Sequence, residues 1–163
     1  MLGDLTYLTV SDASRLIGNG ELSPTDLLEA LLARIDRFEP QVRAWETIDR
    51  AGALKAAREA EAEIVSSGLR GPLHGIPIGL KDIYFTNGIR TSMSSQVYAD
   101  FVPDYDASVV EKLRGAGAVI VGKTVTTEFA MADPPPTVNP WDPKRTPGGS
   151  SSGSAVAVTT GMV

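Results

Sequence analysis

A run of four apolar residues, Ala118-Val119-Ile120-Val121, restricts the possible folds more than any other segment. Because no polar residue alternates with the apolar ones, the run is typical of a β-strand that is buried on both faces. Such a strand needs helices or loops over both faces of its sheet. A second apolar segment, from Ile76 to Tyr84, is interrupted by Lys81 and Asp82 and predicts a second strand.

The first part of the sequence is predicted to be helical. Ser23 followed by Pro24 marks a helix start, because serine caps the first turn and proline suits the first helical position. Apolar residues then recur at helical spacing, and Pro40 is predicted to end the helix. The stripe consists of Leu27, Leu28, Leu31, Leu32 and Ile35. Ser11 predicts the cap of an earlier, shorter helix, and Asp49 that of a later one over about 51–66.

The second part of the sequence has the pattern of an α/β protein. A short strand is predicted over 43–48, and Asp106 is predicted to cap a helix over 107–114 that precedes the buried run. Helices that alternate with buried strands predict an α/β architecture. We divide the sequence into a helical N-terminal segment, 1–70, that packs on the core, and residues 71–163, which begin the α/β core. The sequence stops directly after an apolar element, whereas domain boundaries usually fall in polar linkers, so we expect a single truncated domain.

Composition excludes several classes of function. Among 163 residues, 15 basic and 20 acidic side chains leave a net charge of −5, which gives no electrostatic reason to expect a nucleic-acid partner. No apolar run approaches the roughly 18 residues that span a bilayer, and the N-terminus shows no export signal. We therefore expect a cytoplasmic protein with no membrane partner. With no cysteine and a single histidine, His74, a metal site is not expected.

Residues 117–124 match the phosphate-loop pattern G-x-x-x-x-G-K-[ST]. In a phosphate loop the four middle residues wrap a phosphate with their backbone, and a strand precedes the first glycine. Here the middle residues are the apolar run itself, and a predicted helix precedes Gly117. We interpret the pattern as a helix end, a buried strand and the polar exit of that strand, and nucleotide binding comes last among the candidate functions.

Two segments carry residues that suit catalysis. Residues 148–154 read Gly-Gly-Ser-Ser-Ser-Gly-Ser and lie between a proline-rich loop and an apolar element, which is unlike the setting of a flexible linker. Lys81 lies in an otherwise apolar strand. Burial disfavours the charged form of a lysine, and a neutral lysine is a competent general base near neutral pH. The two segments therefore provide a candidate base, Lys81, and a serine-rich loop, 148–154.

Each of these features also has a simpler interpretation that the sequence leaves open. The serine-rich segment would serve as a capped turn from a loop into a helix. Lys81 would be a half-exposed side chain paired with Asp82 or a neighbouring acid. His74 is interpreted as a turn histidine before a strand rather than as a base, because no serine motif with a paired aspartate surrounds it.

Four sequence segments follow one another in an order that is specific to one protein family. They are Gly75-Ile-Pro-Ile-Gly-Leu-Lys81-Asp82, the stretch from Gly122-Lys-Thr to Thr127-Glu-Phe-Ala130, Asn139-Pro-Trp-Asp142 and the serine–glycine run 148–154. Together they resemble the amidase signature family. The resemblance covers nearly the whole sequence, and it implies a mixed β-sheet covered by helices, of which this sequence is an incomplete piece.

The resemblance implies hydrolysis of a small-molecule amide to a carboxylate and ammonia or an amine, through an acyl-enzyme and a Ser–Ser–Lys triad. Lys81 matches the family's base, and Ser150 matches its bridging serine, which follows a cis peptide bond, here Gly149–Ser150. Ser151 is expected either to support Lys81 through a hydrogen bond or to be a plain loop serine. Because side chains perform all of this chemistry, no cofactor is expected.

The family's nucleophilic serine and oxyanion-hole glycines follow the serine–glycine loop in a Gly-Gly-Ser-type motif, and no such motif occurs between Ser154 and Val163. Ser154 belongs to the loop itself, and Ser92, Ser94 and Ser95 lie in another segment. We therefore expect these 163 residues alone to be inactive. A homo-oligomer, or association with the missing C-terminal part, is left open.

Two other functions remain as alternatives. One is the glutamine amidotransferase subunit of the same family, which takes ammonia from glutamine for the transamidation of charged transfer RNA. The stretch between Met131 and Asn139 argues against it, because this stretch is short and proline-rich where that subfamily has a longer insert. The other alternative is a non-catalytic fragment or pseudoenzyme.

Overall fold

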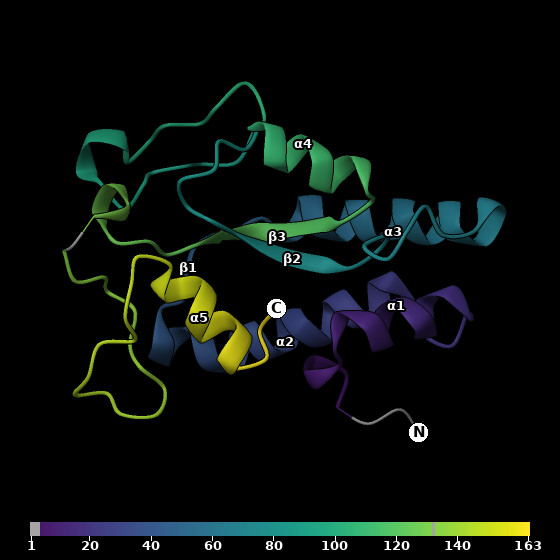
Figure 1. The fold of residues 1–163 in the computed structure, drawn as a ribbon, viewed down its shortest axis with the longest axis horizontal. Coiled ribbons are helices and arrows are strands. Elements are labelled where there is room, and N and C mark those ends of the chain that lie inside the picture. Colours follow the sequence, from purple (N-terminus) through teal and green to yellow (C-terminus); the bar gives the residue numbers. More distant parts are fainter. Residues whose placement is uncertain (1–3, 132) are drawn as a thin grey trace.

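A three-stranded mixed β-sheet forms the centre of the fold (Figure 1). The computed structural model describes residues 4–131 and 133–163. Strand β1 spans Trp45–Ile48, β2 spans Pro77–Lys81 and β3 spans Val119–Thr124, and their order in the sheet is β1-β3-β2. Strand β3 pairs antiparallel with β1 and parallel with β2. This arrangement confirms the prediction of an α/β fold with a mixed sheet.

In the part of the chain that the structure describes, five α-helices surround the sheet. They are α1 (Val10–Gly18), α2 (Pro24–Val42), α3 (Arg50–Ser67), α4 (Ser108–Gly115) and α5 (Ser152–Thr159), and short 3₁₀ helices span Leu5–Tyr7, Gln96–Tyr98 and Glu128–Ala130. Within the described ranges, no helix combines the length and the apolar character that crossing a bilayer requires.

Both faces of the sheet are covered, as the apolar run in β3 predicts. All six residues of β3 are buried. On one face, Val119 and Val121 pack against residues of α2, α3 and α5. On the other face, Ile120 packs with Leu80 of β2 and Val110 of α4. Figure 1 shows the same layering, with α4 on one side of the sheet and α1, α2 and α5 on the other.

Two of the predicted helix starts are confirmed, and two are wrong. The hydroxyl of Ser23 accepts from the N–H of Asp26 at the start of α2, and Asp49 caps α3. Helix α1 is capped by Thr9 rather than by Ser11. Asp106 does not cap α4, because its carboxylate instead accepts from the N–H of Asn87 and from Arg114. A carboxylate that is already occupied by a distant partner leaves the helix start without a side-chain cap.

The prediction that Pro40 ends α2 is also wrong. Helix α2 continues through Pro40 to Val42 and ends at Arg43, which is in the left-handed conformation. A proline removes the helical hydrogen bond that its own N–H would donate, and α2 continues for only two residues beyond it. The adjacent Glu39 binds the emerging chain, since its carboxylate accepts from the N–H groups of Ala44 and Trp45 at 3.0 and 2.9 Å.

The phosphate-loop pattern is part of the sheet and not a loop. Its residues 119–124 form β3, as the interpretation of the motif requires. Between the pairs Ile78–Ile120 and Gly79–Gly122, β3 holds one more residue than β2, which makes a β-bulge. Gly122 is needed beside β1, because a Cβ there would lie 2.2 Å from the carbonyl oxygen of Thr47.

The division of the chain at residue 70 stays a prediction. Strand β1 belongs to the segment 1–70, whereas β2 and β3 belong to the segment 71–163. The antiparallel pairing of β1 with β3 places both segments in one sheet.

His74 is fully buried in the turn that leads into β2. Its Nδ1 accepts a hydrogen bond from the N–H of Arg70 at 3.1 Å, which requires a neutral ring at this nitrogen. Burial lowers the pKa of His74 from its ordinary value of 6.5, and attraction to Glu63 opposes that shift only in part. The fold therefore favours the neutral form of this side chain.

We predict that the protein becomes less stable as the pH drops, because His74 is held in its neutral form in the fold. Because the folded protein binds this proton more weakly than the unfolded chain, the free energy of unfolding decreases as the pH drops below about 6.5 and levels off below the folded-state pKa. Urea unfolding between about pH 7.5 and 5.5 measures the effect. His74→Asn keeps an acceptor for Arg70 without a titrating ring, so the loss should be smaller in this variant. An equal loss in both proteins would contradict the prediction.

Candidate functional site

Lys81 and Ser150 meet at the end of β2. Lys81 is the last residue of β2, and Ser150 lies two residues before the start of α5. Lys81 Nζ donates a hydrogen bond to Ser150 Oγ at 2.5 Å, although 69 positions separate the two residues. The peptide bond between Gly149 and Ser150 is cis, as the resemblance implies. Both side chains are half-buried.

The sheet register sets the position of Lys81 relative to the serine-rich loop. Lys81 lies beside Thr124 of β3, and Thr124 Oγ1 shares a hydrogen bond of 2.7 Å with Ser154 Oγ of α5. After β3 the chain passes the loop again, where the N–H of Thr127 donates to the carbonyl oxygen of Ser150 at 3.0 Å. A backbone contact at Ser150 and a side-chain contact at Ser154 thus hold the loop.

Gly153 lets the start of α5 approach the sheet. Its N–H donates to the carbonyl oxygen of Val125 at 2.9 Å. A Cβ at this position would lie 2.2 Å from the carbonyl oxygen of Ala44 and 2.3 Å from the nitrogen of Val125. Real Cβ atoms do not approach backbone atoms so closely, so any larger residue would push α5 outward. Because Ser150 lies only three residues before Gly153, the approach also affects its distance from Lys81.

Within residues 4–131 and 133–163, Lys81 forms no ion pair with an acid, so the pairing that the simpler interpretation gave it is wrong. Asp82 forms its ion pair with Lys123, with 3.3 Å between Nζ and Oδ1. Among the described residues, Lys81 Nζ donates only to Ser150 Oγ. Burial lowers the pKa of Lys81 from its ordinary value of 10.5, with no opposing carboxylate in the part of the chain that the structure describes. The geometry and the environment both suit a lysine that exchanges a proton with Ser150.

The other residues considered in the sequence analysis do not join Lys81 and Ser150. Ser151 is exposed, and no hydrogen bond joins it to Lys81 within the described part of the chain. His74 precedes the start of β2, at the opposite end of the strand from Lys81. Ser92 binds Asp82, and Ser95 binds Glu128. The structure thus brings together Lys81 and Ser150 but leaves Ser151 as a loop serine.

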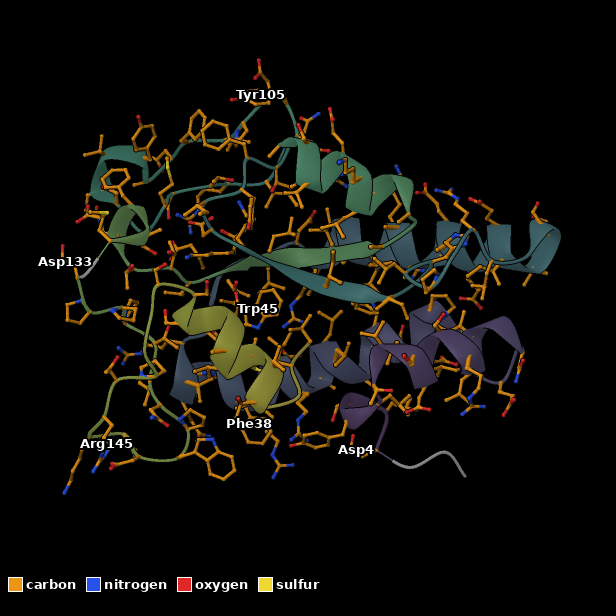
Figure 2. All side chains as sticks on the ribbon, in the orientation of Figure 1. Asp4, Phe38, Trp45, Tyr105, Asp133 and Arg145 are labelled. Atoms are coloured by element: carbon orange, nitrogen blue, oxygen red, sulfur yellow. The ribbon has the colours of Figure 1, made fainter. Side chains whose placement is uncertain are left out.

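A cavity of about 440 Å³ opens beside Ser150. Its wall combines the segment after β3 with the proline-rich loop and the glycines before Ser150, and comprises Thr127, Ala130, Met131, Asp133, Pro134, Pro135, Thr146, Gly148, Gly149 and Ser150. Asp133 lies at the edge of the molecule in Figure 2, on the same side as the loop that carries Arg145. The cavity gives an amide-sized molecule access to Ser150.

The sequence analysis did not identify the residues that pack against β2 and bind the serine-rich loop. Trp45 of β1, labelled in Figure 2, covers Gly79 of β2, where a Cβ would lie 2.9 Å from the indole ring. Thr124 and Thr127 bind the serine-rich loop. Lys123 could have been recognised from the sequence as a buried lysine, because it lies at the end of an apolar run. A buried lysine needs a buried partner.

Comparisons with known proteins point to one family. A family model described as Amidase matches residues 26–163. A glutamyl-tRNA(Gln) amidotransferase subunit of Chloroflexus aggregans is 46% identical over 98% of the chain, which covers 34% of that protein. The chain thus spans about a third of the length of the curated relatives that it matches.

Solved structures show the same fold. The native peptide amidase from Stenotrophomonas maltophilia superposes with a TM-score of 0.88 at 40% identity, covering 96% of this chain and 35% of that one. The corresponding glutamyl-tRNA(Gln) amidotransferase subunit from Thermotoga maritima gives a TM-score of 0.77 at 32% identity, covering 100% of this chain and 34% of that one. The family resemblance that the four sequence segments indicated is thereby confirmed.

We predict that Gly153→Ala destabilises the protein by about 1–3 kcal/mol, because the new methyl group overlaps two backbone atoms. Urea unfolding measures the loss. Gly71→Ala is the matched control, since nothing lies within 4 Å of a Cβ there. If both variants were equally stable, the close approach of α5 would not be a constraint.

We also predict that the amine of Lys81 becomes reactive at a lower pH than a free lysine side chain. Burial alone lowers its pKa, so the shift should persist in Ser150→Ala. Competitive acetylation followed by peptide mass spectrometry measures the titration of Lys81, with Nα-acetyl-lysine amide as the reference. A titration identical to that of the reference compound would contradict the prediction.

Proposed function

The chain belongs to the Amidase family, and we propose that it carries the proton-relay half of a site that cleaves amide C–N bonds. The observation that carries the proposal is the hydrogen bond of 2.5 Å between Lys81 Nζ and Ser150 Oγ. The lowered pKa of Lys81 supports it, because a base must lose its proton near the working pH.

The relay moves protons through Ser150. With Lys81 neutral, its amine accepts the hydroxyl proton of Ser150, while Ser150 Oγ accepts the proton of the attacking serine. The nucleophile then bonds to the amide carbon to form a tetrahedral intermediate. Lys81 returns its proton through Ser150 to the leaving nitrogen, and the C–N bond breaks to leave an acyl-enzyme. Water completes hydrolysis by the same proton path.

The nucleophile in this proposal lies outside residues 1–163. No Gly-Gly-Ser motif follows Ser154, and no hydrogen bond joins the exposed Ser151 to Lys81 within the described residues. The matched relatives are about three times as long as the chain, which leaves room for a serine that would face the cavity at Ser150. Residues 1–163 alone are therefore proposed to be inactive.

For the substrate we propose a small amide that is hydrolysed without the help of partner subunits. The peptide amidase superposes better than the amidotransferase subunit, with TM-scores of 0.88 and 0.77. The proline-rich stretch between Met131 and Asn139 is also shorter than the insert expected in the amidotransferase subunits. The chemistry needs no cofactor, because side chains carry out each proton transfer.

A second candidate is the amidotransferase subunit itself. The amidotransferase subunit of Chloroflexus aggregans shares 46% identity with the chain, more than the 40% of the peptide amidase. In that role the same relay would release ammonia from glutamine, and the chain would work together with partner subunits. Both candidates use Lys81 and Ser150 in the same way.

The test uses the longest natural chain that contains residues 1–163. We expect it to release ammonia from C-terminal peptide amides in the absence of other subunits. Lys81→Met and Ser150→Ala should each lower kcat by about 10²–10⁴-fold, because each interrupts the proton path. Lys144→Met changes an exposed lysine outside the site and is the control.

The outcomes separate the candidates. Activity on glutamine that requires added partner subunits would favour the amidotransferase role. Full activity of Lys81→Met would contradict both roles. Hydrolysis by residues 1–163 alone would show that the nucleophile lies within them.

A further inference from the structure

A fully buried ion pair lies behind the site and takes no part in the relay. The side chains of Lys123 and Asp82 are both 0% exposed, and 3.3 Å separates Nζ from Oδ1. Lys123 Nζ also donates to the carbonyl oxygen of Tyr84 at 2.7 Å and to Thr91 Oγ1 at 2.5 Å. Two of the three N–H groups are therefore used in hydrogen bonds, and the buried ammonium is paired with Asp82, so Lys123 is not available to a substrate.

This buried ion pair is expected to contribute little to the free energy of unfolding. Burial raises the pKa of Asp82 and lowers that of Lys123, and the attraction between the two side chains opposes both shifts. Removing two charges from water costs about as much as their attraction returns, and apolar residues often replace such pairs without loss of stability. A role in positioning accounts better for two charges in the core.

Asp82 holds the segment 92–95. Its Oδ2 accepts from the N–H of Ser92 at 3.0 Å and from the Ser92 hydroxyl at 2.8 Å. Ser92 Oγ in turn accepts from the N–H of Ser94 at 3.2 Å. Met93 and Ser94 have positive φ angles of 55° and 52°, which non-glycine residues adopt at a cost. The segment therefore needs an external anchor, and Asp82 supplies it.

Segment 92–95 in turn holds the chain that follows β3. The carbonyl oxygen of Met93 accepts from the N–H of Phe129 at 3.0 Å, and Ser95 Oγ donates to Glu128 Oε1 at 2.6 Å. Phe129 and Ala130 also have positive φ angles, 47° and 59°. This stretch contributes Thr127, Ala130 and Met131 to the wall of the cavity beside Ser150.

We propose that Asp82, fixed by Lys123, is a positioning residue that holds the cavity wall 127–131 against Ser150 through the segment 92–95. Its importance for catalysis rests on the proposed function, whereas the positioning itself does not. The contacts run from Asp82 through Ser92, Met93 and Phe129 to Thr127, whose N–H donates to the carbonyl oxygen of Ser150 at 3.0 Å.

The test replaces the pair by uncharged residues in two ways. D82L/K123M removes both charges and the acceptor for Ser92, and D82N/K123M removes the charges but keeps an acceptor oxygen. Amide hydrogen exchange of the 163-residue chain reads out each segment separately. We expect D82L/K123M to exchange at least about tenfold faster at 92–95 and 127–131, with α2 and β3 unchanged. D82N/K123M should restore most of the protection.

The matched control is D106L/R114M. Asp106 also pairs with a basic side chain, at 2.9 Å from Arg114, and accepts a loop N–H, that of Asn87. This pair lies at α4, away from the cavity wall, so its loss should leave 127–131 protected. S92A is a milder variant for the case that D82L/K123M does not fold, and it should speed exchange in the same two segments.

Two results would overturn the proposal. In one, segments 92–95 and 127–131 keep their protection in D82L/K123M and in S92A. In the other, all of β3 and α2 lose protection together with these segments, so that the pair holds the fold as a whole.

Activity of the longer natural chain gives an independent readout. In D82L/K123M the cavity wall loosens while Lys81 and Ser150 remain, so KM for a peptide amide should rise and kcat should change by less than about threefold. An unchanged KM with a reduced kcat would contradict a positioning role. If the wild-type chain shows no amide cleavage, the proposed function fails, but the exchange experiment still decides the positioning role.

Discussion

The parallel pairing of β2 with β3 is the interaction on which the candidate site depends. Its last two register pairs are Leu80 with Lys123 and Lys81 with Thr124. Neighbouring residues of a strand point to opposite faces, so the two pairs serve different sides of the sheet. Lys81 and Thr124 reach the serine-rich loop and α5, at Ser150 and Ser154. Leu80 and Lys123 face α4 and the chain after β2.

Small residues allow α5 and β1 to approach β2 and β3 closely, which keeps Ser150 within reach of Lys81. Gly153 brings the start of α5 against the backbone at Ala44 and Val125, and Gly79 leaves room for the ring of Trp45. The two contacts join β1, β2 and α5 around the base of the site. A relay that depends on a hydrogen bond of 2.5 Å needs such support, because a shift of the loop by a methyl group would separate Lys81 from Ser150.

Local sequence patterns predicted the elements better than their ends. The apolar run of β3 and the Ser23-Pro24 start of α2 depend on residues close in sequence, and both predictions are confirmed. Asp106 was predicted as a cap and Pro40 as a helix end, and both predictions are wrong. For Asp106, contacts outside the helix start compete with the local preference, since its carboxylate accepts from Asn87 and Arg114.

The sequence by itself determined the family and the alternation of helices and buried strands, because these follow from residue order and apolar pattern. The family resemblance then implied Lys81 and Ser150 as the candidate relay. Only the tertiary structure decided which acid partners which lysine. The bulge in β3 shifts the alternation by one residue, and such a shift exchanges the two faces of a strand. Lys123 therefore meets Asp82 in the core, and Lys81 donates to Ser150 instead of pairing with Asp82.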